Sequence, residues 1–121
     1  MFGPMPKVEF LWWSECPSWE RALAELRDEM DAAGLDPASV EAREVATDEA
    51  AEREQFVGSP TIRVDGRDVQ PPSGEPVGLN CRVYRHRDGQ VSPLPDRADV
   101  RDALAAVAGE AQRNGAPGAS R

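Results

Sequence analysis

The chain contains two cysteines, Cys16 and Cys81, and a single histidine, His86. A deprotonated cysteine is both a nucleophile and a ligand for soft metals, so these two side chains are the first candidates for chemistry. One histidine and two cysteines far apart in the sequence lack the closely spaced ligand pairs of a structural zinc site. The sequence therefore predicts thiol chemistry, and we expect neither a zinc site nor a cofactor.

Cys16 lies in the segment SECPSW, between an apolar run and a helical pattern. Residues 7–13 are mostly apolar on both alternation sets, which predicts a strand covered on both faces. From Pro17 to Gly34, apolar residues recur every three or four positions, which predicts an amphipathic helix with proline in its first turn. We therefore expect Cys16 at the exposed start of this helix, where free N–H groups and the helix dipole favour a thiolate.

The rest of the chain alternates strand and helix patterns. Residues 39–45 predict a second strand, and Thr47 is a suitable cap for a short helix after it. The segment TIRVDGRDV is typical of a strand, an Asp-Gly turn and a further strand. In LNCRVYRH the apolar alternation places Cys81 with the apolar set, so we expect it to point inward. A last helix is expected to begin at Asp96 or Asp99.

This order of elements predicts one α/β domain that opens with a right-handed βαβ unit and closes with an antiparallel pair and a covering helix. A chain of 121 residues is long enough to bury a single core. Proline and glycine are frequent at both ends. We therefore expect a flexible leader at residues 1–6, the domain at residues 7–112 and a disordered tail at residues 113–121.

Composition and charge exclude several classes of partner. Hydrophobic residues make up 40% and charged residues 30% of the chain, which is typical of a folded domain. The net charge of −8 repels phosphate backbones and anionic lipids, so nucleic acid and membrane are not expected partners. No stretch is apolar for long enough to cross a bilayer, and the expected location is the cytoplasm. Thiols are kept reduced there, which favours reactive or packed cysteines over a permanent disulfide.

The element order is also that of the thioredoxin fold, and two segments resemble that family. VEFLWWSECPSW is similar to its strand, loop and active-site helix, where Cys-x-x-Cys stands at the helix start. Cys16 matches the first cysteine, and Trp19 stands in place of the second. FVGSPTIRVDG resembles the segment in which a proline with a cis peptide bond precedes a strand, which assigns that role to Pro60. The resemblance implies a three-layer α/β/α sandwich with a mixed sheet of about four strands.

The resemblance also implies a function, thiol–disulfide exchange with Cys16 as the nucleophile. Because position 19 is not a cysteine, the mixed disulfide must be resolved by Cys81 or by an external thiol such as glutathione. The expected partner is a thiol or disulfide substrate, either the small thiol glutathione or a partner protein. Glu9 corresponds either to the family's buried acid that shuttles a proton or to an exposed strand position. The residues expected to contact substrate are Trp13, Pro17, Trp19, Ser59, Pro60 and Thr61.

Two alternatives stay open at this point. Small bacterial proteins with similar segments, GCPxW and GLxCRxY, are labelled alkylmercury lyase-like. That resemblance implies a soft-metal or organomercurial protein in which Cys16 and Cys81 are the ligands. The other alternative is a non-catalytic interaction domain with both cysteines packed, because cysteine is among the residue types most often buried. Glu15 and Glu20 would oppose a thiolate at Cys16, so electrostatics alone does not choose between them.

Overall fold

The apolar segment near the start of the chain forms a strand, β1 (Val8–Trp12), as its composition predicts, and this strand lies inside the sheet. It pairs in parallel with β2 (Glu41–Glu44) and antiparallel with β3 (Thr61–Val64). An Asp-Gly turn then leads into β4 (Arg67–Asp68), which pairs antiparallel with β3. The order β2-β1-β3-β4 is the mixed four-stranded sheet that the sequence predicts.

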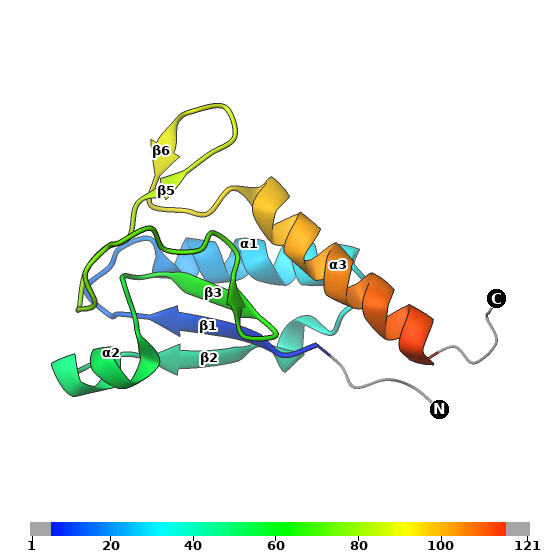
Figure 1. Cartoon of the computed structure of the whole chain (residues 1–121), viewed down its shortest axis with the longest axis horizontal. Coiled ribbons are helices and arrows are strands. Elements are labelled where there is room, and N and C mark those ends of the chain that lie inside the picture. The colour runs from blue at the N-terminus through cyan, green and yellow to red at the C-terminus, as the bar shows by residue number, and fades with distance from the viewer. Residues whose placement is uncertain (1–5, 116–121) are drawn as a thin grey trace.

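The computed structural model describes residues 6–115 of the chain and the side chains as far as residue 107 (Figure 1). Residues 1–5 of the predicted leader and residues 116–121 of the predicted tail therefore lie outside the described residues. Outside the main sheet, the elements are α1 (Trp19–Ala32), the short 3-10 helix η1 (Pro37–Ser39), α2 (Asp48–Glu54), the hairpin of β5 (Tyr84–Arg85) and β6 (Val91–Ser92), and α3 (Arg97–Gly115). Helix α3 extends beyond the domain boundary predicted at residue 112.

The core has two parts, because alternate residues of β1 point to opposite faces of the sheet. Val8 and Phe10 join a cluster with apolar residues of α1 and α3, and these two helices pack against each other. Leu11 joins a second cluster with Val45, Ala51 and Phe56, in and around α2. Figure 1 shows α1 and α3 running beside the sheet and α2 near one end of it. The sheet therefore carries helices on both of its faces.

Three local signals that were predicted from sequence are confirmed. The Thr47 side chain accepts a hydrogen bond of 3.0 Å from the backbone N–H of Ala50, which caps α2. Asp65 and Gly66 both have a positive φ, as a tight hairpin turn between β3 and β4 requires. Asp96 caps α3, since its carboxylate accepts from the N–H of Ala98 at 2.9 Å. No helix among the described residues is apolar over the length needed to span a bilayer.

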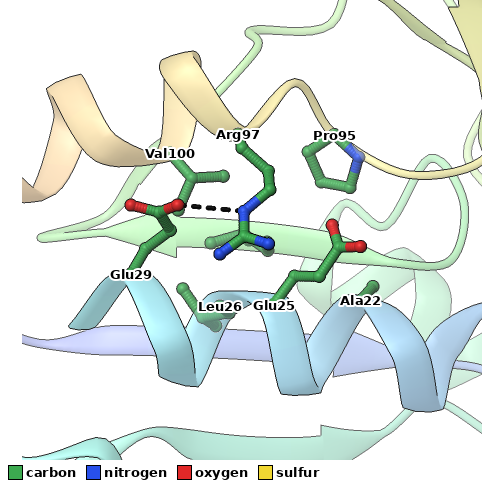
Figure 2. A pocket seen from close by; sticks show the side chains of 8 residues that line it. Ala22, Glu25, Leu26, Glu29, Pro95, Arg97 and Val100 are labelled. Carbon is green, nitrogen blue, oxygen red and sulfur yellow. Dashed lines mark hydrogen bonds and ion pairs between the residues drawn. The ribbon is translucent and has the colours of Figure 1, made fainter. Parts of the chain in front are cut away.

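A buried carboxylate, Glu29 on α1, joins α1 to α3. It accepts a hydrogen bond from Nε of Arg97 at 2.9 Å and from Nε of Arg101 at 3.1 Å, and only 5% of the residue is exposed. Figure 2 shows the Glu29–Arg97 pair beside a small cavity between the two helices. The hydrogen bond from Arg101, reinforced by Arg97, holds the pKa of Glu29 below its usual value. The ion pairs of Glu29 with Arg97 and Arg101 therefore stabilise the packing of α3 against α1 as long as Glu29 is ionised.

Replacing Glu29 by glutamine is expected to lower the free energy of unfolding at pH 7 by about 1–2 kcal/mol, because its charge-assisted hydrogen bonds with Arg97 and Arg101 are weakened. The folded-state pKa is depressed, so the wild-type advantage is present above the unfolded-state value and is lost as pH falls through the folded-state value. Urea unfolding at pH 7 and at about pH 3 measures this difference. Glu25→Gln is the control, because Glu25 lies on the same helix and its ion pair with Arg21 is at the surface. If the difference in unfolding free energy between the wild type and Glu29→Gln were the same at both pH values, the stabilising role of ionised Glu29 would be contradicted.

Candidate functional site

Cys16 lies in a turn before α1 and is not part of the helix. Its backbone N–H donates to the carbonyl of Trp13 at 3.0 Å, while α1 begins only at Trp19 with Ser18 as its N-cap. The prediction that Pro17 occupies the first helical turn is therefore wrong. Only 1% of Cys16 is exposed, so the prediction of an exposed thiol at a helix start is also wrong. The turn places the cysteine inside the protein instead.

The buried thiol of Cys16 faces the Ser59–Pro60 peptide. Its Sγ lies 3.4 Å from the carbonyl oxygen of Ser59, to which it donates. The Ser59–Pro60 bond is cis, the isomer that the thioredoxin resemblance implies for this position. The Ser59 side chain accepts a hydrogen bond of 3.0 Å from the backbone N–H of Trp13, which ties the end of β1 to the same peptide. Two segments that the sequence matched separately thus meet in space.

Cys81 reaches the same peptide from a third segment. Ser59 and Cys81 form an isolated parallel β-bridge. In this bridge the Ser59 N–H donates to the carbonyl of Asn80 at 2.8 Å, and the Arg82 N–H donates to the carbonyl of Ser59 at 2.9 Å. Both cysteines therefore adjoin Ser59. The sequence left open whether the two cysteines come together, and the structure places both of them beside Ser59.

The exposure of the two cysteines is the reverse of what the sequence predicts. Cys81 is exposed and Cys16 is buried. In the segment around Cys81 the alternation is inverted, because Arg82 and Tyr84 are buried while Cys81 and Val83 face outward. The prediction that Cys81 points inward is thus wrong. The physical reason is that Arg82 and Tyr84 find polar partners inside the protein, which removes the penalty for burying them.

The electrostatic environment of Cys81 reflects the neighbouring thiol. Partial burial raises the pKa of the Cys81 thiol, and the charge and hydrogen bonding of Cys16 raise it further. Two thiols that both ionised would place two negative charges side by side, which is costly. The raised pKa therefore favours the neutral thiol of Cys81 at neutral pH. Neither cysteine is in a disulfide in this structure.

Arg82 is the residue at this site that sequence reasoning missed. Its guanidinium is buried and pairs with Asp68 at 2.7 Å, and it also donates to the carbonyl of Gln70. It lies over the ring of Tyr84, 4.5 Å from the centroid, and the Tyr84 hydroxyl donates to the carbonyl of Pro60. These contacts fix the segment that carries Cys81. A pair of opposite charges from separate segments leaves no periodic signal in a sequence.

Most of the predicted substrate contacts already make contacts within the chain, whereas Pro17 is exposed. Ser59, Pro60 and Thr61 are buried, and the Thr61 hydroxyl donates to the carbonyl of Gly58 at 2.7 Å. Trp19 stacks on Trp12 with ring centroids 4.0 Å apart, and both pack against the core on the α1 side. Trp13 packs against the second core cluster, which also contains Leu11, Val45, Ala51 and Phe56. The tryptophans therefore contribute to packing.

Glu9 is buried in the sheet and pairs with cations. Its carboxylate accepts from Arg43 on β2 at 2.8 Å and lies 3.8 Å from the ammonium of Lys7, and 7% of the residue is exposed. Of the two alternatives for Glu9, the exposed strand position is wrong and the buried acid agrees with the structure. Its role as a proton shuttle stays a prediction.

Within the part of the chain that the structure describes, no three His, Cys, Asp or Glu side chains gather in a way that could hold a metal ion. Two thiols are nevertheless enough for an ion that prefers linear coordination. Comparisons with protein-family models, with curated proteins and with solved structures gave no match to this chain.

Proposed function

We propose that the protein is a thioredoxin-fold thiol–disulfide oxidoreductase in which Cys81 attacks the substrate and Cys16 resolves the mixed disulfide. The observation that carries the proposal is the meeting of one exposed and one buried thiol at a single cis-proline peptide. The mixed sheet with helices on both faces, and the position of Ser59–Pro60 directly before β3, support the thioredoxin-like sandwich. The assignment of roles follows from exposure, because a disulfide in solution reaches only Cys81.

The reaction then proceeds in two exchanges. The Cys81 thiolate attacks one sulfur of a substrate disulfide, so that a Cys81–substrate disulfide forms and the other half of the substrate leaves as a thiolate. The Cys16 thiolate next attacks Sγ of Cys81, which forms the Cys16–Cys81 disulfide and releases the second substrate thiolate. Overall, the substrate gains two electrons and two protons, and the protein dithiol loses them. A low-molecular-weight thiol of the glutathione class would reduce the protein again.

The raised pKa of Cys81 sets the expected pH dependence. Only the thiolate attacks, so the rate should keep rising with pH above the ordinary cysteine range. A thiolate of higher pKa is also intrinsically more nucleophilic, which partly offsets its low population. The protein should therefore be a slow reductant at neutral pH and a faster one in alkali. Initial rates against a small disulfide over a range of pH values measure this profile.

Oxidation of the reduced protein is the direct test. Treatment with diamide should yield a Cys16–Cys81 disulfide, seen as the loss of two hydrogen atoms in mass and one disulfide-linked pair of peptides after digestion. Iodoacetamide should modify Cys81 before Cys16 in the folded protein, because Cys81 is exposed. Cys81→Ser is the matched control and should form no intramolecular disulfide. If both thiols stay free after oxidation, or if Cys16 reacts first, the proposal is wrong.

A second candidate function is the binding of a soft cation such as Hg²⁺ or Cu⁺ by the same two thiols. The observation that favours it is that both cysteines adjoin Ser59. Titration with Hg²⁺ would then show one ion per chain, bound tightly in the wild type and weakly in Cys81→Ser. Tight binding together with an absence of disulfide reduction would favour the metal site. Slow alkylation of both thiols and no metal binding would leave only an interaction domain.

A further inference from the structure

The backbone edge beside the two cysteines is occupied by the chain itself. Residues 79–82, which we call the strap, lie along the Ser59–Pro60 peptide. The N–H of Ser59 donates to the carbonyl of Asn80 at 2.8 Å, and the carbonyl of Ser59 accepts from the N–H of Arg82 at 2.9 Å. Pro60 has no N–H, and its carbonyl accepts from the hydroxyl of Tyr84. The main-chain groups at Ser59 and Pro60 are therefore already paired.

The absence of a side chain at Gly58 allows Arg82 of the strap to lie close to the backbone at residue 58. A Cβ at position 58 would stand 2.9 Å from Cβ of Arg82 and 3.0 Å from its Cα, which is closer than real Cβ contacts. The φ angle of Gly58 is +148°, a conformation that side-chain-bearing residues rarely adopt. At the far side of the strap, the buried pair of Arg82 with Asp68 holds it against β4. The strap is thus fixed by close backbone contact at one point and by an ion pair at another.

The contacts of the strap determine which kinds of disulfide can reach the two cysteines. An extended polypeptide binds beside a strand by pairing its main chain with unpaired N–H and C=O groups. At this site it would first have to displace the strap, which means breaking two backbone hydrogen bonds and the buried Arg82–Asp68 pair. A small disulfide needs no such pairing and has only to reach the exposed sulfur of Cys81.

We infer that the strap restricts the Cys16–Cys81 pair to low-molecular-weight disulfides and excludes extended polypeptide disulfides. This inference rests on the proposed exchange function and names its substrate class. The strap takes the place that a substrate strand would occupy, and it carries one of the two thiols with it.

The test compares two oxidants of the reduced wild-type chain. One is hydroxyethyl disulfide, and the other is an unstructured peptide linked to a second copy of itself by one disulfide. Each rate of Cys16–Cys81 oxidation is divided by the rate at which dithiothreitol reacts with the same disulfide, which removes differences in intrinsic reactivity. We expect the normalised rate for the small disulfide to exceed that for the peptide by about tenfold or more. Equal normalised rates, or a preference for the peptide, would overturn the inference while leaving the exchange function intact. Failure of both oxidants would instead overturn the exchange function.

Gly58→Ala should loosen the strap and reduce this preference. The added methyl group has to displace the Arg82 backbone, so the peptide should gain rate relative to the small disulfide by about threefold or more. Gly34→Ala is the matched control, because Gly34 also has a positive φ but open space around its Cα, and its preference should equal that of the wild type. If Gly58→Ala folds and still prefers the small disulfide over the peptide as strongly as the wild type does, the strap does not set the substrate class. If that variant fails to fold, the wild-type comparison alone decides.

Discussion

Replacing Cys16 by serine is expected to stop the exchange reaction at the mixed disulfide. Cys81 stays exposed in this variant and still attacks a small disulfide, but no buried thiol remains to release the adduct. Turnover should fall by about 100-fold or more, because an external thiol replaces a resolving group held in position. The substrate half should accumulate on Cys81, where mass spectrometry of the intact protein and of its peptides detects it.

Serine suits position 16 because its hydroxyl can donate to the carbonyl of Ser59 as the thiol does. A loss of fold is therefore not expected, and the circular dichroism spectrum and the midpoint of urea unfolding should match those of the wild type. Cys81→Ser is the paired variant and should form no adduct at all. An adduct that accumulates on Cys16 in Cys81→Ser, with none on Cys81 in Cys16→Ser, would show that the two roles are exchanged.

Replacing Arg82 by methionine is expected to produce the largest loss of stability among the variants considered. Removing one partner of a buried ion pair leaves the other charge uncompensated, which costs about 3–5 kcal/mol. Here the remaining carboxylate is Asp68, and the carbonyl of Gln70 also loses its donor. Urea unfolding followed by fluorescence gives the change in the free energy of unfolding.

A double-mutant cycle separates the ion pair from the packing of the Arg82 stem. Adding Asp68→Asn to Arg82→Met should restore part of the loss, because the uncompensated charge is then removed as well. Arg85→Met is the matched control, since Arg85 is exposed, and it should change stability by less than about 0.5 kcal/mol. Equal effects of Arg82→Met and Arg85→Met would show that the buried pair does not hold the strap.

Much of the framework could be predicted because it depends on local patterns. The mostly apolar composition of residues 7–13 identified β1 as a strand covered on both faces. The three- and four-residue spacing identified α1, with Ala22, Leu26 and Met30 buried. Thr47 and the Asp65-Gly66 turn were recognisable because each satisfies backbone groups within a few residues.

The start of α1 was less predictable. Proline is favoured in the first helical turn, and that preference placed the start too early. In the structure the carbonyl of Ser18 accepts from the N–H of Ala22, so the first intrahelical bond begins after Pro17. The shift of two residues moves Cys16 out of the helix and into a turn. A terminal residue of a helix is the least certain part of a sequence prediction.

The burial of Cys16 and the exposure of Cys81 were not predictable from local patterns, because both depend on long-range contacts. The alternation rule placed Cys81 inside on the grounds that its neighbours in the pattern are apolar. The rule fails because the competing set contains Arg82, whose partner Asp68 lies on β4 in a separate part of the chain. The meeting of the two cysteines at Ser59 likewise depends on an isolated bridge between loops.

The charged residues of β2 protect the exposed edge of the sheet against pairing with another strand. This strand lies at one edge of the sheet and is largely exposed, with Glu41, Arg43 and Glu44 as three of its four residues. Unpaired strand edges are templates for edge-to-edge aggregation, and charged side chains are the usual protection against it. Two edges of this kind brought together would place glutamates against glutamates. The strand that completes the sheet on this side therefore also limits its growth into a larger one.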